Sequence, residues 1–177
     1  PSTEGLVFPF RAVSLNAVDV RIIKVFESNI PQFLQVNRLG GEREIQRVGR
    51  VVKKCTVELN PDGDKDLNQW NTFFLDLEDL ISVDRGAIYR VELDFRMKHS
   101  TYDCGDIEED EGAIEETEDW DSFDADNSYW DYYDDYYYNY GYWDYTYRER
   151  YNPCDQSYYY YQRPKARNII ASDLGII

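Results

Sequence analysis

The feature that most constrains the fold is a period-two pattern of apolar residues over positions 87–98. Apolar side chains occupy the odd positions, which are Ala87, Tyr89, Val91, Leu93, Phe95 and Met97. Charged side chains occupy the even positions from 90 onward, namely Arg90, Glu92, Asp94, Arg96 and Lys98. Successive side chains of a β-strand point to opposite faces, so this period of two predicts one long strand with one face against a core.

Other stretches of the N-terminal half also have the pattern of strands. Val18, Val20, Ile22 and Phe26 share one predicted face, with Asp19 and Arg21 on the other. A third face comprises Val51, Cys55, Val57 and Leu59, a fourth comprises Phe73, Leu75 and Leu77, and residues 7–15 supply a first strand. A short helix is expected at residues 28–35, where Pro31 limits its length. In this interpretation Cys55 is a small buried hydrophobe and not a reactive thiol.

Short strands separated by polar turns leave no room for the helices of a βαβ fold. Turn signals lie at residues 37–41, 60–63 and 84–86. The predicted class is therefore all-β, an antiparallel β-sandwich of the fibronectin/Ig-like type. Tyr89 follows the Gly86 turn, a place where a sandwich tyrosine can bond back to the preceding connection through its hydroxyl. Simple packing of Tyr89 in the core, with its hydroxyl in water, is the alternative.

A long acidic, tyrosine-rich insertion interrupts this pattern. The chain has a net charge of −16, and 15 of its 17 tyrosines lie between Tyr129 and Tyr161. From Asp103 to Asp155 there are 19 acidic residues and two basic ones, and aliphatic residues are almost absent. Such a sequence cannot bury enough aliphatic surface to form a core of its own.

The chain divides into the main body of the sandwich at residues 1–100, the insertion at 101–155, and a closing strand with the start of a linker at 156–177. Within the last part, residues 157–162 are expected to close the sandwich and residues 165–177 to form an exit strand. No signal peptide opens the sequence, and no stretch is long and apolar enough to cross a membrane. We expect both ends to continue into a longer protein.

The cysteines are informative by position. Cys104 and Cys154 flank the insertion, while Cys55 lies in a predicted strand. A Cys104–Cys154 disulfide would close the insertion at its base and would indicate an oxidising compartment. Three free thiols are the alternative. A zinc site is poorly supported, because there is no Cys-x-x-Cys pair and His99 is the only histidine.

Residues that could carry chemistry are few. Asp119, Asp121, Asp124 and Asp126 offer hard oxygen ligands for calcium, although no EF-hand pattern surrounds them and a solvated acidic loop is the alternative. No other cofactor is expected. His99 is expected to be exposed at a strand end lined by Lys and Arg, and so gives no catalytic triad. Carboxylates in a solvated loop lack the burial that prepares an acid–base pair, so the sequence indicates no enzyme.

Charge and aromatic content suggest the kind of partner. The negative field argues against nucleic acid. Trp and Tyr give large contact area at low entropic cost, and the acidic residues between them favour basic proteins. The residues singled out for recognition are Trp130, Tyr132, Tyr133, Tyr136, Tyr137 and Trp143. Packing of these rings on the sandwich surface is the competing interpretation.

Three stretches of the chain resemble one family. They are FRAVSLNAVDVRIIKVFESNIPQFLQVN at 10–37, LEDLISVDRGAIYRVELDFR at 77–96 and RNIIASDLGII at 167–177. They look like the bacterial alpha-2-macroglobulin family, in the large form found in Bacteroidota. The resemblance implies one macroglobulin domain, a fibronectin-like sandwich, within a string of such domains that traps proteases.

The resemblance transfers no chemistry, because the thioester motif of the family, Cys-x-Glu-Gln, is absent. Cys55 is followed by TVE, Cys104 by GDI and Cys154 by DQS. The implied role is a non-catalytic structural domain of a broad-spectrum protease inhibitor. Its implied partners are other macroglobulin domains of the same chain and, through the full-length protein, target proteases.

The resemblance also implies a location. Family members are exported to the periplasm or cell surface and are lipid-anchored, here through the missing N-terminal part, with no membrane contact by this fragment. The alternative function is an envelope binding module whose acidic, Tyr-rich loop captures a basic protein, a glycan or calcium.

Overall fold

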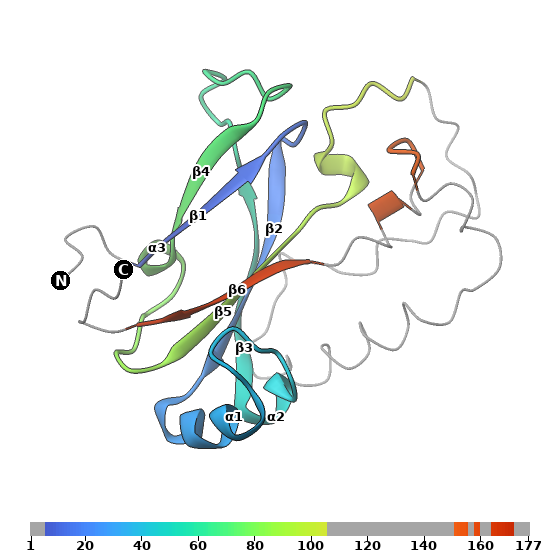
Figure 1. Ribbon diagram of the computed structural model, residues 1–177. Coiled ribbons are helices and arrows are strands. Elements are labelled where there is room, and N and C mark those ends of the chain that lie inside the picture. Colours follow the sequence, from blue (N-terminus) through green and yellow to red (C-terminus); the bar gives the residue numbers. More distant parts are fainter. Residues whose placement is uncertain (1–5, 106–150, 156–157, 160–163, 172–177) are drawn as a thin grey trace.

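The computed structural model describes residues 6–105, 151–155, 158–159 and 164–171, and its strands form two antiparallel sheets (Figure 1). One sheet pairs β1 (Val7–Ala12) with β4 (Asn71–Asp76). The other has the order β3 (Gly49–Glu58), β2 (Ala17–Val25), β5 (Ile88–Asp94) and β6 (Lys165–Ile170). The prediction of an all-β chain with antiparallel pairing is confirmed.

The helical segments of the described residues are short. They are η1 (Glu27–Asn29), α1 (Ile30–Val36), α2 (Ile45–Val48), α3 (Leu77–Leu80) and η2 (Met97–His99). α1 is the short helix predicted at residues 28–35, and Pro31 lies in its first turn, where a missing N–H costs no helical hydrogen bond. In this part of the chain no helix has the length and apolar composition to span a membrane.

The facing sides of the two sheets share one hydrophobic core. Its members from β2 and from the alternation at 87–98 are Val18, Val20, Ile22, Ala87, Tyr89, Val91 and Leu93. Its members from β1 and β4 are Phe8, Ala12, Phe73 and Leu75. The sheets therefore pack on each other through apolar side chains, and the period-two pattern predicts the core face of β2 and β5 correctly.

A β-bulge changes which residues of β3 face this core. Two consecutive residues of β2 pair with Lys53 and Val51, which leaves Val52 as an extra residue in β3. Cys55 consequently packs against the main core, whereas Val51 belongs to a second cluster on the other face of the sheet. The predicted common face for Val51 and Cys55 is wrong for this reason.

The second cluster lies where α1 and α2 cover the outer face of the four-stranded sheet. It consists of Ile23, Val25, Phe33, Ile45, Val48, Val51 and Ile88. Phe26, predicted to face the main core, is exposed instead. β2 ends one residue earlier and the chain turns into η1, so the alternation no longer applies at this position.

β5 is shorter than the alternation predicts, and both of its faces are buried. The strand ends at Asp94, and residues 97–99 form η2 instead of continuing the sheet. Arg90 and Glu92, predicted to face solvent, are only 6% and 8% exposed. Arg90 Nε donates to Glu92 Oε1 over 2.6 Å. Arg90 and Glu92 therefore lie on a buried face of β5, and their charges are paired with each other.

Tyr89 makes the hydrogen bond expected of a sandwich tyrosine. Its side chain is fully buried, and its hydroxyl accepts a hydrogen bond from the backbone N–H of Asp84 over 2.8 Å. The side chain of Asp84 also pairs with Lys24 of β2. Gly86, with φ at +84°, makes the turn between Asp84 and the strand. The connection between α3 and β5 is thereby fixed to the core.

We expect Tyr89→Phe to lower the free energy of unfolding by about 1–2 kcal/mol, because it leaves the Asp84 N–H without its partner. Urea unfolding followed by circular dichroism measures this change. Tyr102→Phe removes a hydroxyl from an exposed ring and is the matched control, with an expected change within about 0.5 kcal/mol. Equal losses in the two variants would contradict a specific role for the Tyr89 hydroxyl.

β6 forms one edge of the four-stranded sheet. Its ladder with β5 runs from the pair Leu93–Lys165 to the pair Ile88–Ile170. Ala171 extends the ladder, since its N–H donates to the carbonyl of Ala87 over 3.0 Å. Residues 165–170 of the predicted exit strand at 165–177 are thus part of the sheet, and residues 172–177 lie outside the described residues. Residues 158–159 have helical backbone, so the expected closing strand at 157–162 is not formed at these two positions.

Candidate functional site at the neck of the acidic segment

A disulfide joins the two ends of the acidic segment. Cys104 and Cys154 are bonded, with Cα atoms 5.4 Å apart and a sequence separation of 50. The predicted pairing is confirmed. We use the word neck for residues 100–105 together with 151–155, 158 and 159, which flank positions 106–150; those positions lie outside the described residues.

Short polar side chains fold the chain around each cysteine. Asp103 Oδ1 accepts a hydrogen bond from Gly105 N–H over 3.1 Å. Asn152 Oδ1 accepts one from Cys154 N–H over 3.0 Å. Asp and Asn form such turns readily, because their side chains imitate a backbone carbonyl. The sequences DCG and NPC therefore carry a signal for two turns that present the sulfur atoms to each other.

The first arm of the neck is fastened to other connections at the same end of the fold. Thr101 N–H donates to Ser14 O over 2.9 Å, and Ser14 N–H donates to Leu67 O over 2.7 Å. Asn16 N–H donates to His99 O over 2.8 Å. Figure 1 shows these connections at the end of the fold opposite α1 and α2. Backbone hydrogen bonds therefore anchor the neck to the connection between β1 and β2, which is itself bonded to the connection between β3 and β4.

Tyr159 fastens the second arm of the neck to the first. Its ring is buried and packs edge-on against Phe95, with 5.7 Å between the ring centres. Its hydroxyl donates to Pro153 O over 2.6 Å. Burial raises the pKa of the Tyr159 hydroxyl, and a hydrogen bond with Ser100 of the first arm partly opposes this shift. Tyr159, one of the clustered tyrosines at 129–161, thus helps to hold the neck together.

Two polar residues beside the neck are buried, namely Asp19, from the polar face predicted for β2, and His99, which was expected to be exposed. Arg96 binds the Asp19 carboxylate with two nitrogen atoms, Nε to Oδ2 at 2.6 Å and Nη2 to Oδ1 at 2.9 Å. Thr56 Oγ1 also donates to Asp19 Oδ1, over 2.7 Å. The predicted exposure of His99 is wrong because Arg96 turns back toward β2 and brings η2 with it.

His99 has a structural position in this arrangement. Its Nδ1 accepts a hydrogen bond from the Arg96 N–H over 3.3 Å and lies 3.8 Å from Asp19 Oδ2. Nδ1 therefore takes part in the hydrogen bonding of its own turn and lies near the buried Asp19 carboxylate. The expected exposure of His99 is wrong, because its side chain is buried.

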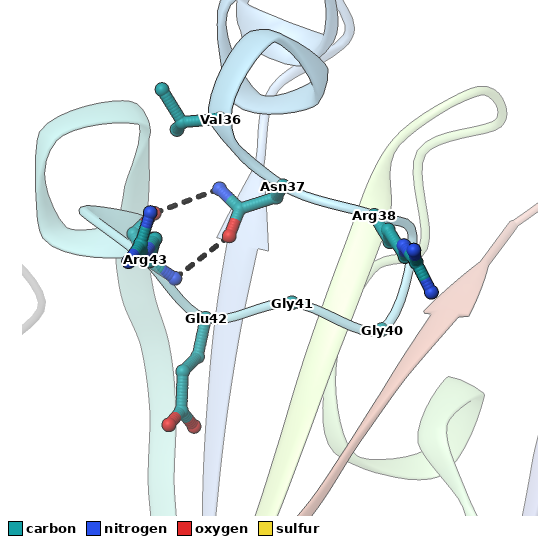
Figure 2. A pocket seen from close by; sticks show the side chains of 7 residues that line it. All are labelled: Val36, Asn37, Arg38, Gly40, Gly41, Glu42 and Arg43. Carbon is teal, nitrogen blue, oxygen red and sulfur yellow. Dashed lines mark hydrogen bonds between the residues drawn. The ribbon is translucent and has the colours of Figure 1, made fainter.

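A second polar feature lies at the opposite end, where residues 36–43 enclose a shallow open hollow (Figure 2). Asn37 closes this loop, since its Nδ2 donates to Arg43 O and its Oδ1 accepts from Arg43 N–H, both over 2.8 Å. Arg38 and Glu42 are the other charged residues of the lining. The Glu42 carboxylate is held by Arg90 of β5.

Cys55 behaves as the small hydrophobe that the sequence predicts. It is the free cysteine of the described residues, and it is half-buried in β3 against the main core. Burial raises the pKa of its thiol, while Lys53 acts in the opposite direction. A raised pKa leaves little thiolate at neutral pH, and only the thiolate is strongly nucleophilic.

The remaining predicted site residues lie outside the described residues. They are the calcium candidates Asp119, Asp121, Asp124 and Asp126, and the recognition candidates Trp130, Tyr132, Tyr133, Tyr136, Tyr137 and Trp143. Over residues 6–105 and the described parts of 151–171, no three His, Cys, Asp or Glu side chains are grouped so as to hold a metal ion.

Sequence reasoning missed the buried ion pairs of the four-stranded sheet. A partial signal was present, because Arg21 of β2 and Glu92 of β5 carry opposite charges and are direct cross-strand partners. The pairing of Asp19 with Arg96 had no such signal, since Arg96 follows the end of β5 and reaches back to β2.

Comparison of the chain with known protein families, with curated proteins and with solved structures gave no match. The fold and the neck together give a structural description of the chain and identify no family. The chain is an all-β domain in which a disulfide closes a long acidic connection between β5 and β6.

Proposed function

We propose that the two sheets are the B–E and C′–C–F–G sheets of a fibronectin/Ig-like sandwich. Reading β1 to β6 as strands B, C, C′, E, F and G reproduces the pairing of such folds. The hydrogen bond of Tyr89 supports this reading, because the tyrosine corner of these domains lies near the start of strand F. The acidic segment then occupies the F–G connection.

We propose further that the chain is a non-catalytic structural domain of an alpha-2-macroglobulin-like protease trap of the cell envelope. One observation carries this proposal: the sandwich-type strand order combined with a disulfide across the F–G connection. Domains of the family are fibronectin-like, and disulfides persist outside the reducing cytosol. The missing thioester motif fits a supporting role, in which the partners are neighbouring domains and, through the whole protein, captured proteases.

The intact parent protein, purified from its native envelope, tests the proposal. It is mixed with trypsin, and the hydrolysis of casein and of a small peptide substrate is measured. A trap suppresses casein hydrolysis and spares the small substrate, because an enclosed protease stays accessible to small molecules only. Unchanged casein hydrolysis with the parent protein in molar excess would overturn the proposal. The 177-residue chain alone is expected to change neither rate and to incorporate no methylamine.

The neck favours a second candidate function, an envelope binding module. Tyr102 and Tyr151 are 57% and 76% exposed on the two arms, beside a segment rich in the same residue type. Such rings, with acidic neighbours, suit a basic protein or a glycan. Pull-downs with the whole chain and with a variant carrying a Gly/Ser linker in place of 106–150 test this. A partner retained by the whole chain alone supports it, and identical partners for both proteins contradict it.

Calcium is the remaining ligand of this second candidate. Melting the chain with calcium and with EDTA tests it, since a ligand that binds only the folded state raises the melting temperature. A saturable upward shift of several degrees supports a site, and coincident melting curves contradict it.

A further inference from the structure

We propose that the loop at residues 36–43, with the adjoining end of β6, is a docking surface for an acidic protein segment that carries aromatic or aliphatic side chains. The proposal goes beyond the function given above, which assigns no role to this end of the fold. The surface comprises Val36, Arg38, Leu39, Arg43 and Ile170, and we call it the arginine loop surface.

The sheet holds the loop in a fixed position. Asn168 of β6 donates through Nδ2 to the carbonyls of Leu39 and Gly41, both over 2.8 Å. Glu42 binds Arg90 of β5, with Oε2 2.5 Å from Nη2. Asn37 holds the other side, since its Nδ2 also donates to the carbonyl of Phe33 in α1 over 3.1 Å. A loop pinned in this way loses little conformational entropy when a partner binds.

The two glycines of the loop differ in what they do. A Cβ at Gly41 would stand 2.5 Å from Asn37 Oδ1, so Gly41 is needed for the loop to close. A Cβ at Gly40 would meet nothing within 4 Å, and Gly40 is not among the glycines with positive φ. Neither the space around position 40 nor its backbone conformation therefore requires glycine. Its absence of a side chain leaves the backbone open to close approach by a ligand.

Two arginines flank the hollow with their charges available. Figure 2 shows Arg38 and Arg43 on opposite sides of it. Both are exposed, and in the part of the chain that the structure describes neither guanidinium is paired with a carboxylate. Arg90 and Arg96, in contrast, each bind an acidic side chain. Guanidinium groups bind carboxylates through two parallel hydrogen bonds, so this pair suits a segment with more than one acid.

Exposed aliphatic side chains in the same loop and on β6 favour a protein ligand. Val36, Leu39 and Ile170 are 48%, 44% and 36% exposed. Ile170 lies two residues from Asn168, hence on the same face of β6 as the side chain that binds the Leu39 carbonyl. A bare anion such as phosphate would leave this apolar area uncovered. An acidic segment with apolar side chains uses both the arginines and the aliphatic area.

The test uses the whole chain and a fluorescein-labelled peptide of residues 119–147. This peptide has eight acidic residues, no basic residue and a high content of Tyr and Trp, so it represents the proposed chemistry. Fluorescence anisotropy is expected to show saturable binding in the range of about 10–300 μM, which weakens in 0.5 M salt. A peptide with Asn and Gln at all acidic positions is expected to bind about tenfold more weakly. A peptide with Ser at all aromatic positions is expected to lose about fivefold.

Paired variants locate the binding site. Arg38→Glu combined with Arg43→Glu is expected to weaken binding at least about tenfold. Lys165→Glu combined with Arg167→Glu makes the same charge change on exposed positions of β6 and is expected to cost less than about twofold. Val36→Ser combined with Leu39→Ser keeps both arginines and is expected to cost about threefold or more. Melting curves confirm that each variant is folded.

Three outcomes would overturn the proposal. The first is no saturable binding of the acidic, aromatic peptide up to about 1 mM. The second is equal weakening of peptide binding by the two charge-reversal pairs. This would mean that the change in net charge of the chain, and not this surface, causes the weakening. The third is unchanged binding in the Val36→Ser, Leu39→Ser variant, which would remove the apolar contribution and with it the argument for a protein segment.

Discussion

Replacing Asp19 by alanine is expected to lower the free energy of unfolding by about 3–5 kcal/mol, the cost of removing one partner from a buried ion pair. Asp19 is 1% exposed and accepts three hydrogen bonds, two from Arg96 and one from Thr56. Without the carboxylate, the guanidinium loses two charge-assisted hydrogen bonds in a mostly enclosed position. The loss is expected near the lower end of the range, because the Arg96 side chain is 19% exposed and keeps some access to water.

Urea unfolding followed by tryptophan fluorescence measures the loss. Asp62→Ala removes an exposed aspartate and is the control, with an expected change within about 0.5 kcal/mol. Asp19→Leu combined with Arg96→Met replaces both charges by apolar groups, and is expected to recover most of the stability that Asp19→Ala loses. A loss below about 1 kcal/mol for Asp19→Ala would contradict the view that this pair supports the fold.

Asp19→Ala is also expected to have a local consequence that hydrogen exchange can detect. Arg96 starts the turn that contains His99 and leads to the neck, and its backbone N–H donates to His99 Nδ1. Exchange at residues 96–101 is expected to rise in Asp19→Ala under conditions where β2 and β5 remain protected. Uniform loss of protection across the chain would mean that the pair supports the frame as a whole and has no special effect on the neck.

The inner face of the sheets is predictable from sequence because it is uniformly apolar. Val18, Val20 and Ile22 of β2 and the odd positions of β5 reach one core, so a period of two identifies them without knowledge of their partners. Tyr89 belongs to the same group, since a tyrosine after a glycine turn carries both its packing and its hydrogen bond in local sequence. The disulfide was predictable because its two cysteines are the boundary of a change in composition.

The outer face was not predictable, because its polar residues are buried by pairing. Period-two reading assigns every charged position of a strand to solvent. Asp19, however, pairs with Arg96 beyond the end of β5. Glu92 pairs with Arg90 of its own strand and with Arg21 of β2. The bulge at Val52 has a different origin, since it depends on how two strands align and leaves no mark in one of them. The arginine loop surface was missed because exposure of its side chains follows from the way Asn37 and Asn168 hold the loop.

Opening the Cys104–Cys154 disulfide is expected to destabilise the pairing of β6 with β5 more than it destabilises the pairing of the other described strands. β6 reaches β5 through the connection from Asp94 to Lys165, and the disulfide shortens this path by joining its two sides near the frame. A bond with a sequence separation of 50 contributes about 4 kcal/mol through loop-closure entropy. Reduction is therefore expected to release the edge strand, together with the buried ring of Tyr159.

Cys104→Ser combined with Cys154→Ser, made in a Cys55→Ser background, isolates this effect without thiol exchange. The melting temperature is expected to fall by about 8–16 °C relative to Cys55→Ser alone, from a loss of about 4 kcal/mol in a chain of this size. Hydrogen exchange is expected to rise first at residues 165–170. Unchanged protection there, with a melting temperature within about 2 °C, would contradict the role of the disulfide in holding β6.

The length of the acidic segment decides how much of this loss is entropic. Replacing residues 106–150 by a linker of about six residues shortens the closed loop to roughly ten, which lowers its closure entropy by about 1.4 kcal/mol. Loss of the disulfide should then cost about 1.4 kcal/mol less than in the whole chain. Equal losses would place the contribution in contacts of the neck, such as the Asp103 and Asn152 turns, which both proteins retain. Because only loop length differs between the two comparisons, the difference in loss measures the constraint that the disulfide places on the segment.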